Sequence, residues 1–228
     1  MVRTNGDVGK PKMSEPTEQA KSAVLTVGEG RGFVVESLGN RVIVTGAHCL
    51  PHFPPCHGTS YTEERTYAEL LGPLGAKPTV WAECLFADPI ADIAVLGSPD
   101  NQELFKKANA YEALVESVKP LKIAASPLEG WAWLLSLNGE WFQCTVEYQK
   151  HVDGPLWVTN PAQEIVGGMS GSPILSDDGK AIGAICLGSL VAGEDSASLA
   201  KGDSHNPRLT RDLPARFLRS WRPKLSSV

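Results

Sequence analysis

Short hydrophobic runs separated by turn residues make up most of the chain from residue 23 onward. The runs are rich in valine, isoleucine and aromatic residues, which favour β-strands. They are AVLTVGEG, RGFVVES, RVIVTGA, PTVWAECLFAD and IAVLGS in the first half, and WAWLLSL, EWFQCTVEY, LWVTNP, SPILS and KAIGAICLG in the second. Asn138-Gly139 and Asp178-Gly179 each join two runs, as in tight hairpins. The pattern predicts an antiparallel all-β protein in two halves, with a cleft between two packed barrels.

Two stretches have a different pattern. NQELFKKANAYEALVES, residues 101–117, places apolar side chains near one helical face, so we expect a short helix or an irregular connector between the halves. Near the end, Asp212 is a candidate N-cap, Pro214 lies in the first turn, and an apolar stripe ends at Trp221. This predicts a C-terminal helix docked on the second half.

These patterns divide the chain into four segments. Residues 1–22 are polar, contain two prolines and lack the apolar core of a secretory signal, so we expect a disordered lead-in. Residues 23–115 form the first barrel, 116–206 the second barrel, and 207–228 the C-terminal helix and tail. If the chain is complete, we expect a cytoplasmic protein.

Composition narrows the choice of partners. The chain is 42% apolar and 21% charged, as in ordinary soluble domains, and its uncharged stretches are too short to span a membrane. The net charge is −5, and basic residues crowd together only in the tail, where a solvated helix face explains them best. We expect neither a nucleic-acid nor a membrane partner, and nothing indicates the oligomeric state.

The cysteines suggest a reducing compartment. There are five of them at irregular spacing: Cys49, Cys56, Cys84, Cys144 and Cys186. The segment HCLPHFPPCH carries metal-binding residue types, namely Cys49, His52, Cys56 and His57, but their spacing matches no closed zinc site. We therefore expect no metal and no cofactor. The segment is predicted to be a loop with free thiols, or with one Cys49–Cys56 bridge at most.

Three polar residues at the boundaries of predicted strands are candidates for chemistry. His48 follows the run RVIVT, Asp92 precedes the run IAVL, and Ser170 stands in the glycine-rich loop GGMSGS. Each alone has an ordinary explanation, as a packed strand end, a turn cap or a flexible loop. Together they supply the base, the orienting carboxylate and the nucleophile that acyl transfer requires.

The same residues lie in three ordered motifs: TGAHC (45–49), DIAVL (92–96) and GMSGSP (168–173). In their order and spacing the chain resembles the chymotrypsin-like (trypsin-like) serine peptidases over about residues 23–205. The resemblance implies two antiparallel six-stranded β-barrels, with a catalytic triad in the cleft between them. It also implies an endopeptidase that cleaves a peptide or protein substrate.

The resemblance assigns catalytic roles to four residues. Ser170 would be the nucleophile, His48 its general base, and Asp92 the residue that orients the imidazole. The backbone amides of Gly168 and Ser170 would form the oxyanion hole.

The resemblance also suggests where substrate binds. The segment Cys186, Leu187 and Gly188 corresponds to the strand that pairs with the substrate main chain. Glu164 stands six residues before the nucleophile, where the floor of the S1 pocket often lies, and would favour lysine or arginine at P1. Alternatively, Glu164 points to solvent.

Departures from the family pattern are informative. Met169 stands where zymogen-activated enzymes carry an aspartate that receives a new N-terminus. Phe33, 16 residues before Cys49, stands near where they place the disulfide partner of that cysteine. Both departures are typical of the bacterial and viral branch, which needs no such activation. Cys186 replaces a residue that is commonly a serine supporting the triad aspartate.

Two alternatives concern the same site. A cysteine peptidase based on Cys49 is disfavoured, because a thiol directly after His48 in an extended strand would point to the opposite face. The stronger alternative is a catalytically idle trypsin-like domain that acts as a peptide-binding or scaffolding module, since residues in the right order need not assemble into an active geometry.

Overall fold

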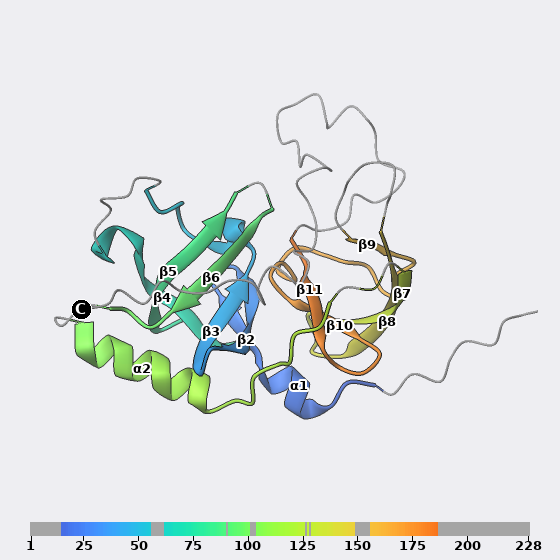
Figure 1. The fold of residues 1–228 in the computed structure, drawn as a ribbon, viewed down its shortest axis with the longest axis horizontal. Coiled ribbons are helices and arrows are strands. Elements are labelled where there is room, and N and C mark those ends of the chain that lie inside the picture. Colours follow the sequence, from blue (N-terminus) through green and yellow to red (C-terminus); the bar gives the residue numbers. More distant parts are fainter. Residues whose placement is uncertain are drawn as a thin grey trace, which may run out of the picture.

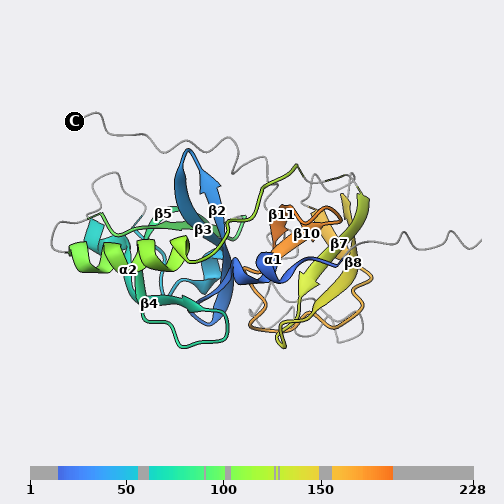
Figure 2. The same ribbon diagram turned by 90° about the horizontal axis from the view of Figure 1, so that it is seen from below.

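In the computed structural model, two β units lie side by side with a short helix beneath their junction (Figures 1 and 2). The structure describes residues 15–55, 62–89, 91–100, 104–125, 127, 129–148 and 156–186. Its mostly β content in two units confirms the predicted two-barrel all-β fold. The C-terminal helix predicted within 207–228 lies outside the described residues.

The first unit is a closed, antiparallel six-stranded barrel with the strand order β1-β2-β3-β6-β5-β4. Its strands are β1 (Val24–Val27), β2 (Gly30–Ser37), β3 (Asn40–Thr45), β4 (Thr66–Pro73), β5 (Val80–Asp88) and β6 (Ile93–Gly97). Closure through the β1–β4 pair removes the exposed strand edges. This unit is called the first barrel below.

The second unit is a half-barrel with the strand order β11-β10-β7-β8-β9. Its strands are β7 (Glu129–Leu135), β8 (Trp141–Tyr148), β9 (Leu156–Thr159), β10 (Pro173–Ser176) and β11 (Ala181–Ala184). Five of the six expected strands thus appear among the described residues. The two predicted hairpin turns are confirmed, because Gly139 and Gly179 lie between paired strands with φ of 78° and 74°.

Two α-helices and two 3-10 turns complete the described elements: α1 (Glu18–Ser22), α2 (Phe105–Glu116), η1 (Ala47–Cys49) and η2 (Thr62–Arg65). Helix α2 confirms the helical connector, and Tyr111 fastens it to the first barrel by donating to the carbonyl of Leu96 at 3.0 Å. Helix α1 falls at the end of the segment expected to be disordered. Thr17 caps its N-terminus and Ala20 is buried, which explains its order.

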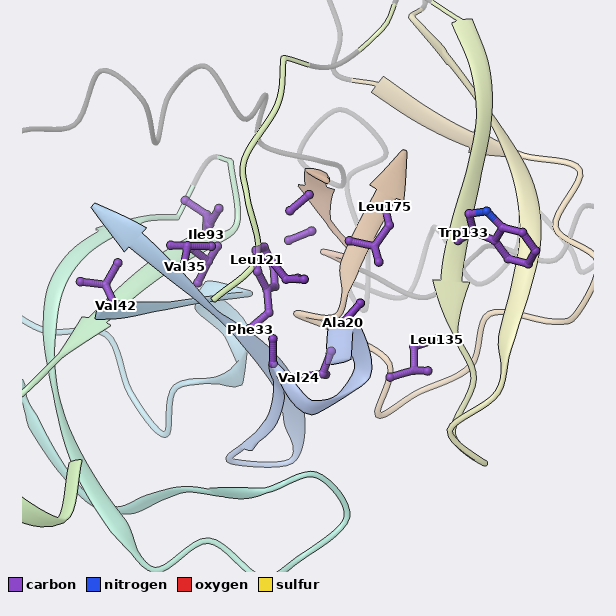
Figure 3. Close-up of a cluster of buried hydrophobic side chains, with 14 of the residues drawn as sticks. Ala20, Val24, Phe33, Val35, Val42, Ile93, Leu121, Trp133, Leu135 and Leu175 are labelled. Atoms are coloured by element: carbon purple, nitrogen blue, oxygen red, sulfur yellow. The ribbon is translucent and has the colours of Figure 1, made fainter. Parts of the chain in front are cut away.

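Alternating side chains divide the core into layers. In β2, Val34 points into the first barrel, whereas Phe33 and Val35 point toward the half-barrel. There they share one buried cluster with Leu135 and Leu175, which Figure 3 shows between the two units. A third cluster fills the half-barrel. The junction between the units is therefore a continuous apolar core. No helix within the described residues is long and apolar enough to cross a membrane.

Candidate active site

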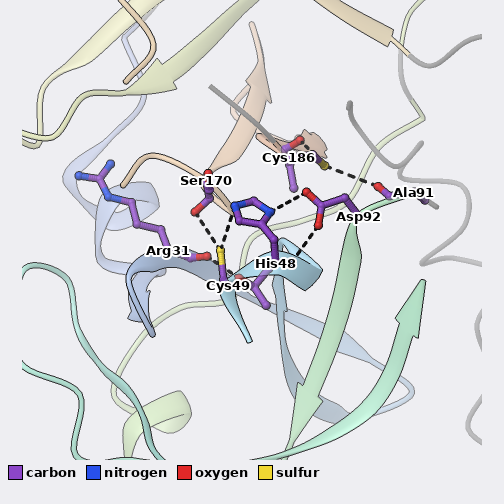
Figure 4. Close-up of polar contacts among 9 residues, drawn as sticks. Arg31, His48, Cys49, Ala91, Asp92, Ser170 and Cys186 are labelled. Carbon is purple, nitrogen blue, oxygen red and sulfur yellow. Dashed lines mark hydrogen bonds and ion pairs between the residues drawn. The ribbon is translucent and has the colours of Figure 1, made fainter. Parts of the chain in front are cut away.

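His48 lies in a 3-10 turn just after β3, and this turn is hydrogen-bonded to Asp92. The backbone N–H of His48 donates to Asp92 Oδ1 at 2.9 Å, and the amide of Ala47 donates to the Asp92 carbonyl at 3.1 Å. On the imidazole, Nδ1 lies 2.6 Å from Asp92 Oδ2 (Figure 4). These contacts fix both the position of the ring and its orientation.

Asp92 adopts an unusual backbone conformation. Its φ is +52°, and aspartate tolerates this left-handed region better than most residues. The residue is only 8% exposed, so its carboxylate is largely shielded from water. A strained, buried carboxylate that makes two hydrogen bonds to one histidine is typical of a functional site.

The histidine environment strongly favours its protonated form. Its pKa is raised from 6.5 to about 10, first by the hydrogen bond to Asp92 and then by the contact with Cys49, while burial acts in the opposite direction. The imidazole is therefore protonated at neutral pH and becomes a proton acceptor under alkaline conditions.

Cys49 lies next to the imidazole rather than on the opposite face. Its Sγ is 3.8 Å from His48 Nε2 and 3.8 Å from the carbonyl oxygen of Ser170 (Figure 4). The expectation that the thiol would point away was wrong, because residues 47–49 form a 3-10 turn and not an extended strand. Cys49 is a buried free thiol, and Cys56 lies outside the described residues.

Ser170 lies in the loop between β9 and β10, across the junction from His48. Its carbonyl accepts a hydrogen bond from the backbone N–H of Arg31 at 2.7 Å, and the Gly171 amide donates to the Ile185 carbonyl at 2.5 Å. Gly168, two residues earlier, has φ of +87°. The loop is thus fixed by backbone bonds to both units, and its turn at residue 168 requires a glycine.

A cavity of about 580 Å³ opens between the two units. It is lined by Gly28, Glu29, Gly30, His48, Cys49, Leu50, Pro51, Gly167, Gly168 and Ser170. The structure thus brings the predicted base and nucleophile to one cavity, with Asp92 behind the base. Within the described residues, no hydrogen bond joins Ser170 Oγ to His48 Nε2, whose contact is Cys49.

The predicted substrate-binding residues are only partly described. Glu164 is exposed and does not line the cavity, so its role in P1 selection stays a prediction. Cys186 is buried, and its Sγ donates to the Ala91 carbonyl at 3.7 Å, next to Asp92 in the chain. Leu187 and Gly188 lie outside the described residues.

The β2 residue that faces Cys49 is a glycine. Phe33 is buried in the core between the units, whereas a Cβ on Gly30 would lie 2.5 Å from Cys49 Sγ. Residue 30 is thus the one that faces this cysteine.

Only Cys49 and His52 of the four candidate metal ligands lie within the described residues. Cys56 and His57 lie beyond the described residues, and within the described part no group of three metal-binding side chains occurs.

Sequence patterns gave no signal for Arg31. It is 5% exposed at the junction, where its guanidinium donates to the carbonyls of Leu135 and Ser136 at 2.8 and 3.0 Å. A lone arginine in GEGRGFVVE reads as a surface residue of an alternating strand. Only the packing of the second unit against β2 buries it.

Comparisons with known proteins leave the family open. No protein-family model matches the chain, and no curated protein matches it. One solved structure similar to it comes from work on how aromatic interactions drive the coupled folding and binding of the intrinsically disordered Sesbania mosaic virus VPg protein. The two are 15% identical with a TM-score of 0.49, over 89% of this chain and 92% of that one. That likeness is too low to bear on function, and the two-barrel fold described above is compatible with a trypsin-like domain.

Proposed function

We propose that this protein is a trypsin-like serine endopeptidase with the triad His48, Asp92 and Ser170. The observation that carries the proposal is the 2.6 Å contact between His48 Nδ1 and Asp92 Oδ2, behind a cavity that both His48 and Ser170 line. A histidine oriented by a buried carboxylate and facing a serine across a cleft is the arrangement that acyl transfer needs.

The chemistry would proceed in two stages. With His48 in its neutral form, which predominates above its pKa of about 10, Ser170 Oγ attacks the scissile carbonyl carbon while His48 Nε2 accepts its proton, and the amides of Gly168 and Ser170 donate to the oxyanion. The protonated His48 then gives its proton to the leaving amine, which leaves an acyl-enzyme. Water then attacks the acyl carbon while the same nitrogen takes its proton, and that proton passes to Ser170 Oγ as the acyl group leaves as a carboxylic acid. Asp92 stabilises the imidazolium throughout both stages.

The free cysteines at and near the site support a location in a reducing compartment. Cys49 and Cys84 are buried thiols outside any disulfide, as is typical of cytoplasmic proteins. We propose that the substrate is a peptide or protein chain that binds along the segment from Cys186 to Gly188.

One observation favours a second function, a peptide-binding module with an idle triad. His48 Nε2 contacts the Cys49 sulfur. The pKa of the imidazole is about 10, so His48 is protonated and cannot act as a base at neutral pH. In this alternative, the cavity would hold a peptide without cleaving it.

Labelling with a fluorophosphonate probe separates the two functions. We expect the intact protein to form an adduct that peptide mass spectrometry locates on Ser170, because only an activated hydroxyl reacts with such probes. Ser170→Ala should lose the adduct by removing the nucleophile, and His48→Ala by removing the base. An unlabelled protein with an intact thermal unfolding transition, tested up to alkaline pH, would contradict the peptidase and favour the binding module.

A further inference from the structure

Arg31 is a buried cation at the junction between the two units. It belongs to β2, is 5% exposed, and burial lowers the pKa of its guanidinium. Arginine nevertheless keeps its charge in proteins. Within the described residues, Arg31 forms no ion pair with a carboxylate. A buried charge held without a carboxylate needs several well-placed acceptors.

Those acceptors all belong to the half-barrel. The guanidinium donates to the carbonyl of Leu135 at 2.8 Å and to that of Ser136 at 3.0 Å. It also lies 3.5 Å from the hydroxyl of Ser172, two residues after Ser170. The side chain points away from the His48 ring (Figure 4). One planar fork therefore contacts the end of β7 and the loop that carries the serine.

The backbone of Arg31 contacts both halves of the site. Its N–H donates to the carbonyl of Ser170 at 2.7 Å, and its own carbonyl accepts from the Thr45 hydroxyl at 2.6 Å, three residues before His48. Arg31 therefore contacts the Ser170 loop through its backbone amide and the end of β7 through its guanidinium.

The turn held by Arg31 also contacts Gly168, one of the two residues whose amides are predicted to form the oxyanion hole. Ser136 begins the β7–β8 turn, in which its carbonyl accepts from the amide of Gly139 at 3.0 Å. In the same turn, the side chain of Leu137 lies 3.4 Å from where a Cβ on Gly168 would be. Arg31 thus holds the turn whose Leu137 side chain approaches Gly168.

We propose that Arg31 is a positioning residue, which holds the Ser170 loop and the β7–β8 turn in register with the His48–Asp92 pair. Its catalytic consequence rests on the function proposed above, whereas the positioning does not. Loss of the fork removes a charged donor from the buried carbonyls of Leu135 and Ser136, of which that of Ser136 keeps the amide of Gly139, and it frees both segments to move relative to the first barrel.

The chain offers a matched control in Arg41. Its guanidinium also donates to two carbonyls, those of Val115 and Val118, at 2.7 and 3.0 Å. These bonds tie β3 to the C-terminal end of α2, and Arg41 does not line the cavity. Arg31→Met and Arg41→Met therefore remove the same kind of bond in two different places.

Hydrogen exchange tests the positioning without requiring activity. In Arg31→Met we expect faster amide exchange in residues 166–172, and in Arg41→Met faster exchange only around residues 113–118. Arg31→Lys provides a second variant if Arg31→Met does not fold, since it keeps a buried cation that cannot span both carbonyls. Wild-type exchange at residues 166–172 in the folded Arg31 variants would overturn the proposal.

Labelling kinetics then test the catalytic consequence. We expect the maximal rate of fluorophosphonate labelling at Ser170 to fall by about 10- to 100-fold in Arg31→Met, because small displacements of a nucleophile have effects of that size. The probe concentration at half-maximal rate should stay unchanged, and Arg41→Met should label like the wild type. An equal loss in both variants would mean a purely structural role. If even the wild type fails to label, the function proposed above fails while the exchange result still decides the positioning.

Discussion

The two halves of the candidate site are held in different ways. His48 and Asp92 belong to the same barrel, and three hydrogen bonds between 2.6 and 3.1 Å join Asp92 to the turn that carries the histidine. Ser170 belongs to the other unit, and its carbonyl is bonded across the junction to the amide of Arg31. The base and its carboxylate are thus a property of the first barrel alone, whereas the position of the nucleophile depends on how the two units pack.

The two halves of the site therefore depend on different physical features. The first half requires a correct local pattern of donors and acceptors around one carboxylate. The second requires a close approach of two backbones, which the apolar cluster between the units stabilises. A substitution in the first half should therefore alter chemistry more than stability, and a substitution in the second should alter both.

Asp92→Asn is expected to have the largest effect on chemistry. The amide can still accept from the backbone N–H of His48, but it presents an NH₂ group to Nδ1 and so favours the wrong tautomer. We expect the labelling rate of Ser170 to fall by about 10⁴-fold, as when a carboxylate that orients a catalytic histidine is replaced. Thermal unfolding should show a folded protein. A rate within tenfold of the wild type would mean that Asp92 does not orient the base.

Gly171→Ala tests the close approach in the second half. Gly171 has φ of +79°, and a Cβ there would overlap the Arg31 carbonyl oxygen at 1.8 Å. We expect a loss of more than about 3 kcal/mol in the free energy of unfolding, because backbone must move on both sides of the junction. Urea denaturation measures this loss.

Gly179→Ala is the matched control for that substitution. Gly179 has a similar φ of +74°, but no atom lies within 4 Å of the added Cβ. Conformational strain alone should cost about 1 kcal/mol. Equal losses in the two variants would show that the contact with Arg31 does not constrain the junction.

The first half of the site was the more predictable from sequence. His48 and Asp92 stand at strand boundaries, and strand boundaries follow from hydrophobic patterning. The two-unit β fold, the hairpin glycines and helix α2 followed from the same kind of local signal. The meeting of His48 with Ser170 at one cavity was expected only from the resemblance, because no local pattern sets the packing of two barrels.

What sequence missed depends on long-range contacts. Arg31 becomes buried only when residues more than a hundred positions later pack against it. The thiol of Cys49 lies next to His48 because residues 47–49 form a 3-10 turn where an extended strand was expected. Hydrophobic periodicity predicts strands and helices, but it predicts neither a single 3-10 turn nor a contact between distant segments.

The titration of His48 should affect stability through the first half. Its folded-state pKa of about 10 lies above the ordinary value of 6.5, so the stabilising contribution is complete below pH 6.5 and is lost as pH rises toward 10. We expect urea midpoints to decline over this range. His48→Gln should decline less steeply, since it retains every other titrating group. Identical slopes would show that the His48–Asp92 pair does not stabilise the fold.

Cys49→Ala should have the smallest effect and concerns the point where the two halves meet. The thiol contacts both His48 Nε2 and the Ser170 carbonyl, and it is the second cause of the raised pKa of His48 after Asp92. Without it, the pH midpoint of the labelling rate should move below that of the wild type, because one partner of the charged imidazole is gone. Cys84→Ala is the control, since that buried thiol donates to the carbonyl of Phe86 and does not line the cavity. If both variants keep the wild-type midpoint, the carboxylate alone sets the protonation of His48, and the first half of the site works independently of its contact with the second.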